Sequence, residues 1–181
     1  MRGCRSSQGF SMIEMLVSLV VICVGVLGML AMQGRSIQLT QSTVSQSQAV
    51  LLADNLLELM RSNPAGALSG DLFSSASAYY KASGADFTSG SAELANCLSR
   101  SRSLGGSSVA TADLNCWQQD VLSLLPVNDA LLKSSFTICP SQAAGSCSAG
   151  SASVVMIQIA WLDKTGACAD NVCIYQLRSE L

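Results

Sequence analysis

The sequence contains no histidine and few charged side chains. Without histidine, the chain lacks the most common general base, the most common metal ligand and the central residue of every Ser-His-Asp triad. Charged residues make up only 12% of the chain, whereas 49% of its residues are hydrophobic. Such a low charge density is unusual for a soluble globular protein, and it indicates that part of the chain lies in lipid or against a partner.

Clusters of basic residues are also missing. Lys and Arg number 10 against 12 Asp and Glu, which gives a net charge of −2. No run of Lys and Arg is interleaved with aromatic residues, so nucleic acid is not an expected partner. The length of 181 residues suits one ordinary domain with an appendage rather than two full-sized cores.

The N-terminus combines a short polar leader with a long apolar run. Residues 1–9 carry Arg2 and Arg5 and no acidic residue, as a positively charged leader does. The run at 10–32 contains one charged residue, Glu14. Its apolar stretch from Met15 to Met32 covers 18 residues. At 1.5 Å per residue, this approaches the length of about 20 residues that crosses a bilayer core. The sequence therefore predicts a transmembrane helix directly after the leader.

The candidate cleavage site lies on the unusual side of this run. An ordinary secretory signal is cut after its apolar region, whereas here the small residue, Gly9, precedes it. Cleavage between Gly9 and Phe10 would leave the apolar helix on the mature chain. The positive leader also predicts that the N-terminus stays in the cytoplasm and that the remainder is exported.

The motif GFSMIE at residues 9–14, with the apolar run behind it, resembles the class III signal of type IV prepilins. The resemblance implies that prepilin peptidase, a membrane-embedded aspartyl peptidase, cuts after Gly9 and methylates the new N-terminal residue, Phe10. It also implies that Glu14 is the acidic residue used in fibre assembly.

A physical reason supports a partner for Glu14. A carboxylate near the bilayer core costs about 2.5 to 3.5 kcal/mol on insertion scales, and the free amine of a neighbouring subunit at Phe10 would offset that cost. Alternatively, Glu14 reaches the membrane interface of an ordinary signal anchor.

One long helix is expected beyond the membrane. No proline occurs from Phe10 to Ser62, and Pro64 stops the pattern just past its end, so the helix would be about 80 Å long. In its second half an apolar stripe of helical spacing predicts one face that packs on a globular head. The stripe comprises Val44, Leu52, Leu56, Leu59 and Met60.

Two further stretches narrow the resemblance. The sequence LLADNLLELMRSNPAGA at Leu51–Ala67 is similar to the end of the long helix in minor pilins of the type IV pilus modification protein PilV family, and ICVGVLGM at Ile22–Met29 agrees with it. The close resemblance covers roughly the first third of the chain.

The expected head is small and contains both helices and strands. Ser-, Ala- and Gly-rich stretches at 69–90 and 99–111 suit loops and small helices. Residues 113–125 predict an amphipathic helix with Trp117 in the core. Strand patterns follow at 135–139, 154–162 and 173–178, and the last two are joined through a turn at Lys164, Thr165 and Gly166. An antiparallel sheet packed on the long helix would give an α+β, type IV pilin-like fold.

Six of the eight cysteines lie in the expected head, because Cys4 leaves with the leader and Cys23 lies in the membrane helix. An even number in an exported head predicts disulfides, and among the 15 connectivities of six cysteines we favour pairing between neighbours. A zinc site is the alternative, but the sequence offers neither a CxxC pair nor a histidine, so no metal or other cofactor is expected. The favoured pairs are Cys97 with Cys116, Cys139 with Cys147 and Cys168 with Cys173.

The expected organisation is a leader at 1–9, a transmembrane half of the long helix at 10–32, an exported half at 33–63 and a head at 64–181. The resemblance implies a minor pilin that primes pilus assembly at or near the tip and supports twitching motility and adhesion. Its partners would be prepilin peptidase, other minor pilins, the major pilin and a large tip adhesin. It would be a single-pass inner-membrane protein with a periplasmic head, and would enter the pilus on assembly.

Two other functions remain open. A minor pseudopilin of a type II secretion system would share the signal and the long helix. A membrane-anchored envelope enzyme or receptor would keep its anchor uncut, although the sequence shows no GxSxG elbow and no phosphate-binding glycine loop. We expect no enzymatic activity.

Overall fold

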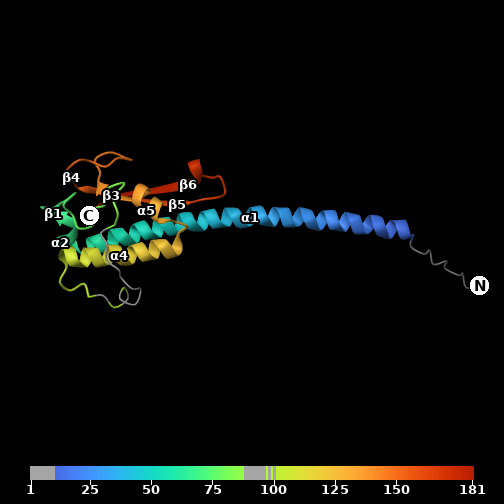
Figure 1. Cartoon of the computed structure of the whole chain (residues 1–181), viewed down its shortest axis with the longest axis horizontal. Coiled ribbons are helices and arrows are strands. Elements are labelled where there is room, and N and C mark those ends of the chain that lie inside the picture. Colours follow the sequence, from blue (N-terminus) through green and yellow to red (C-terminus); the bar gives the residue numbers. More distant parts are fainter. Residues whose placement is uncertain (1–10, 88–96, 98, 100) are drawn as a thin grey trace, which may run out of the picture. The chain divides into compact units, whose positions relative to one another are not determined.

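The computed structural model of the chain describes residues 11–87, 97, 99 and 101–181 (Figure 1). Its longest element is helix α1, Met12–Arg61, which begins and ends within two residues of the predicted limits. The chain divides into two compact units, Met1–Gln41 and Ser42–Leu181. The second unit, here called the head, therefore includes the last part of α1.

The head holds the remaining helices and two small antiparallel sheets. One sheet has the order β1-β2-β4 and the other the order β3-β5-β6. Among the elements whose residues are all described, the helices are α2 (Pro64–Ala67), α4 (Gly106–Leu124), α5 (Asp129–Ser135) and the 3-10 turn η1 (Ala169–Asn171), and the strands are β1 (Leu68–Ser69), β2 (Leu72–Ser74), β3 (Thr137–Pro140), β4 (Ser151–Ala152), β5 (Val154–Leu162) and β6 (Val172–Glu180).

The β5–β6 hairpin is the largest part of the second sheet. Its register runs from Val154 opposite Glu180 to Leu162 opposite Val172. Strand β5 lies between β3 and β6 and is buried on most of its length. The hairpin and its turn agree with the prediction, and the elements together confirm an α+β, pilin-like fold.

The head packs on both sides of its part of α1. In Figure 1, α4 runs alongside this part of α1, while β5 and β6 lie on the other side. The indole Nε1 of Trp117 on α4 donates a 2.8 Å hydrogen bond to the carbonyl of Leu52 on α1. On the sheet side, Arg61 donates to the Ser179 hydroxyl and the Glu180 carbonyl of β6.

An aromatic cluster fills the centre of the head. The rings of Phe87, Trp117 and Phe136 have centroids 6.0 to 6.3 Å apart in tilted or edge-on arrangements, the geometry that aromatic pairs favour. Trp117 is 1% exposed, so its predicted place in the core is confirmed.

Three details of the prediction were wrong. Val44 is 49% exposed and Leu59 only half-buried, whereas the face of α1 that packs on the head consists of Ala49, Leu52, Ala53, Leu56, Leu57 and Met60. Helix α4 begins at Gly106, inside a stretch expected to hold loops and small helices. The strands form two sheets instead of one, because the short strands β1 and β2 pair with each other and β2 pairs with β4, apart from the predicted strands.

Candidate functional site

The N-terminal part of α1, residues Met12–Gln41, exposes all of its large apolar side chains. Their exposed fractions run from 51% at Val26 to 89% at Met12. The helix is long and apolar enough to cross a membrane, and its most apolar 18-residue window has a mean hydropathy of 2.7 with 0% of that window buried. Apolar surface on this scale is covered by lipid or by partners in a functioning protein.

Glu14 lies in the first turn of this helix. The backbone N–H of Glu14 donates to the carbonyl of Ser11 at 3.0 Å, which closes the turn. A carboxylate at this end of a helix faces the positive end of the helix dipole. Gly9 and Phe10, the predicted cleavage and methylation residues, lie outside the described residues.

The comparisons with known proteins bear on this same segment. Residues 4–30 match the family model described as the prokaryotic N-terminal methylation motif. The chain carries a prepilin signal. The signal supports a type IV pilin or pseudopilin, and it implies processing by prepilin peptidase and assembly with other pilins. Together with the exposed apolar helix, it is consistent with membrane anchoring and incorporation into pili. No curated protein and no solved structure matches the chain.

The matched segment includes Gly9, Phe10 and Glu14. It ends within the apolar half of α1, so the match does not extend to the head.

Three disulfides brace the head, and they join the neighbouring cysteines favoured from the sequence. The Cα–Cα distances of 5.5, 5.6 and 5.2 Å lie in the usual range. The pairs are Cys97–Cys116, Cys139–Cys147 and Cys168–Cys173. Cys23 is free and exposed on the apolar half of α1.

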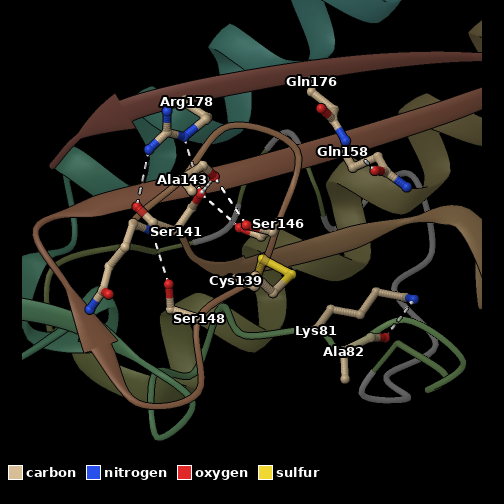
Figure 2. The surroundings of a disulfide bond; sticks show 12 residues. Lys81, Ala82, Cys139, Ser141, Ala143, Ser146, Ser148, Gln158, Gln176 and Arg178 are labelled. Atoms are coloured by element: carbon tan, nitrogen blue, oxygen red, sulfur yellow. Dashed lines mark hydrogen bonds between the residues drawn. A yellow bond between two sulfur atoms is a disulfide. The ribbon is translucent and has the colours of Figure 1, made fainter.

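Ser141 organises the loop closed by Cys139 and Cys147 (Figure 2). Its hydroxyl lies 2.8 Å from the carbonyls of both Ala143 and Ser146 and donates to one of them at a time. It also accepts a 3.1 Å hydrogen bond from Nε of Arg178 on β6. The disulfide and this contact together hold an otherwise exposed loop against the sheet.

A buried polar network ties the end of α1 to the start of α4. Asn63 donates to the Tyr79 hydroxyl at 3.1 Å and to the Gly106 carbonyl at 2.9 Å, and it accepts from the Gly106 N–H at 2.7 Å. The Tyr79 hydroxyl donates to Asp113 at 2.7 Å. Burial, followed by the hydrogen bond to Asp113, raises the pKa of Tyr79 well above its usual value, so the hydroxyl keeps its proton.

Arg102 completes this network. Its guanidinium donates a 2.7 Å hydrogen bond to the fully buried Asp113 and a 3.0 Å hydrogen bond to the carbonyl of Leu59 near the end of α1. A cation at the C-terminus of a helix is favourable because the carbonyls there carry partial negative charge. The network therefore holds the C-terminal end of α1, just before Pro64, against the start of α4.

Lys81 is a buried lysine with an unusual set of partners. Its ammonium group donates to the carbonyls of Ala82, Lys133 and Phe136, the shortest at 2.7 Å, and lies 5.0 Å from the centre of the Phe87 ring. Desolvation lowers the pKa of Lys81 to about 8. Since the three carbonyls and the ring all favour the charged form, this lysine serves as a structural tie between the 81–87 segment and α5.

Asp163, Cys168 and Cys173 place one possible ligand atom each within 4.8 Å of one another. Both sulfurs are joined in a disulfide, however, so they are not available as thiolate ligands. Asp163 instead accepts from the Thr165 hydroxyl at 2.7 Å, from the Thr165 N–H at 2.9 Å and from the Ser42 hydroxyl at 3.2 Å. The Thr165 hydroxyl is the main reason that the pKa of Asp163 is lowered.

No local sequence pattern marks these polar groups as buried. Asn63, Tyr79 and Asp113 are polar residues tens of positions apart, and nothing local distinguishes them from solvated ones. A lysine such as Lys81 is usually exposed. Its position three residues before Gly84 and directly after an aromatic pair carries no recognisable pattern.

Proposed function

We propose that the chain is a minor pilin of the PilV type, a structural subunit and not an enzyme. It would enter the type IV pilus with other minor pilins as part of a priming or tip complex, and would support twitching motility and adhesion. The single observation that carries this proposal is the prepilin signal at 4–30, joined to an exposed apolar helix. The helix-end similarity at Leu51–Ala67 supports the finer assignment.

The architecture suits a subunit that is held first by lipid and later by its neighbours. The apolar part of α1 buries nothing of its own, whereas the head has a complete core and three disulfides. Moving such a chain from membrane to fibre exchanges lipid for other helices around α1 and leaves the head intact. In the fibre, Glu14 would pair with the free amine of a neighbouring subunit.

The first test is the N-terminal mass of the protein from membranes with and without prepilin peptidase. The proposal requires a chain that begins at methylated Phe10 only when the peptidase is present. A chain that keeps Met1 in both strains would leave an ordinary signal anchor and end the proposal.

Glu14→Ala tests the assembly step. We expect cleavage to continue and the amount of the protein in sheared fibres to fall strongly, because the carboxylate that sets register is lost. Glu58→Ala is the matched control, since Glu58 is an exposed acidic residue of the same helix, with its side chain 69% exposed. Equal recovery of both variants in fibres would contradict the role of Glu14.

A minor pseudopilin is the second candidate, because the methylation motif supports pilins and pseudopilins alike. Deleting the gene separates the two. Loss of surface pili and twitching with normal protein secretion would favour the pilin, and the opposite result would favour the pseudopilin.

A further inference from the structure

The segment Met12–Gln41 contains two charged residues, Glu14 and Arg35, and they have opposite signs. Both are exposed. The salt bridges within the described part of the chain are Arg61–Glu58, Arg102–Asp113 and Lys133–Asp86, so neither charge has an ionic partner among those residues.

The helix prevents these two charges from meeting within one chain. At 1.5 Å per residue their positions are about 31 Å apart along the axis, and they lie within about 60° of each other around it. Residues 15–34 between them carry no charge. This spacing matches the hydrocarbon thickness of a bilayer of about 30 Å, so in the membrane each charge reaches a polar interface.

Assembly into a fibre takes Arg35 away from the polar interface of the membrane. When the apolar part of α1 leaves lipid and packs among other helices, Arg35 at its exported end loses its contact with lipid headgroups, and a cation buried between helices is unfavourable unless it is paired. A guanidinium in such a place is best matched by a carboxylate, which it binds with two parallel hydrogen bonds. The surface next to Arg35 therefore suits a partner helix that carries an acidic residue in an apolar setting.

Glu14 of this chain is an example of such an acidic residue. It is a single acidic residue in the first turn of an apolar helix, and a second subunit with the same kind of signal presents the same group. We propose that Arg35 binds the signal carboxylate of another processed prepilin-type helix, which is parallel to α1 and displaced by about 31 Å toward the exported end. The two oxygens of that carboxylate can accept from Arg35 and from a free N-terminal amine together. Because that neighbour lies further out, this chain is not the outermost subunit of its complex. The inference rests on the proposed function.

Arg35→Gln tests this pairing in the full chain. We expect its fraction in sheared fibres, relative to its amount in membranes, to fall by about tenfold. Arg35→Lys keeps the charge but loses the paired hydrogen bonds, so it should recover part of that fraction.

Moving the cation provides the matched control. Gln33 is exposed on the same helix, about 160° around the axis from Arg35. The double variant Arg35→Gln with Gln33→Arg keeps composition and charge but turns the charge to the opposite face. Pairing requires that this variant also fails to enter fibres. Recovery to the wild-type level would mean that a lipid headgroup, which accepts a cation on any face, was the partner, and would overturn the proposal.

A photo-cross-linking amino acid at position 38, which lies one turn beyond Arg35, identifies the partner directly. The expected product joins this chain to the first two turns of the helix of a processed prepilin-type subunit, and the same group at position 33 should not give it. Products with lipid alone, or with a later part of a partner, would refute the pairing. If wild-type chain were unprocessed or absent from fibres, the proposed function itself would fail, so the two failures are distinguishable.

Discussion

The two units of this chain use the same apolar residue types in opposite ways. In Met12–Gln41 the large apolar side chains are exposed, whereas in the head the corresponding residues form one continuous core around Trp117, Leu56 and Ile157. The head also carries three disulfides and a buried polar network, while the exposed segment has two charges in its described part. A side chain in the head is therefore held by its own chain, and one in the exposed segment depends on its surroundings.

The largest expected effect concerns two leucines on α1. Leu56 is fully buried and Leu51 is 67% exposed. Leu56→Ala should lower the free energy of unfolding of the head by about 2 to 5 kcal/mol, because it leaves a cavity in the core. Leu51→Ala should change it by less than about 0.5 kcal/mol.

Urea unfolding of the full chain in detergent, followed by the fluorescence of Trp117 and Trp161, measures both changes. These two indoles are 1% and 4% exposed, so their emission reports on the head core. Similar losses in the two variants would show that Leu51 is covered in solution and that the distinction between the two faces of α1 is wrong.

Two glycines, Gly66 in the head and Gly25 in the exposed segment, allow the same comparison with a smaller expected change in stability. A Cβ added at Gly66 would lie 2.6 Å from both the Asn63 amide nitrogen and the Gly106 carbonyl, whereas one added at Gly25 meets nothing within 4 Å. Gly66→Ala should destabilise the head by about 1 to 3 kcal/mol through overpacking. Gly25→Ala should not destabilise it, since alanine favours a helix by about 1 kcal/mol.

Thermal unfolding of the two glycine variants in the same detergent checks this prediction. A drop in the midpoint for Gly25→Ala as large as that for Gly66→Ala would mean that the apolar segment contributes packing to the head. No drop for Gly66→Ala would mean that the junction between α1 and α4 is less tightly packed than the contacts of Asn63 indicate.

Patterns of local periodicity were enough to predict much of the fold. The proline-free run before Pro64 predicted α1, and the alternation in Val154–Leu162 predicted the central strand of the larger sheet. The start of α4 at Gly106 could not be predicted, because Gly105, Gly106 and the serines after them are typical of a loop. Helix formation there depends on the contact of Asn63 with Gly106, which involves residues 43 positions apart.

The candidate site likewise has a part that the sequence predicts and a part that it does not. The signal at 9–14 is contiguous in sequence, so a motif was sufficient to find it. The exposure of Val44 depends on how α1 is rotated against the head, and a stripe of apolar residues does not fix that rotation to within one position. The surroundings of Lys81 and Asp163 likewise come from elements that meet only in the folded head.

The smallest expected effect lies at Ser42, where the head's part of α1 begins. Ser42 donates to Asp163 at 3.2 Å, and Thr165 donates to both carboxylate oxygens of Asp163. These bonds lower the pKa of Asp163 in the folded head, with the Thr165 hydroxyl as the largest cause. The unfolded chain therefore binds the proton at higher pH than the folded head does, and the stability that the carboxylate contributes is complete above its unfolded value of about 3.9.

As the pH falls through that value toward the folded pKa, this contribution is lost. Asp163→Asn removes the titration, so the difference in unfolding free energy between wild type and variant should be constant near neutral pH and shrink below about pH 4. Asp120→Asn, an exposed acidic residue of α4, controls for the removal of one negative charge. A difference between wild type and Asp163→Asn that stays constant down to pH 2.5 would show that Asp163 titrates alike in the folded and unfolded chain, and that its bonds to Thr165 and Ser42 do not favour the charged form.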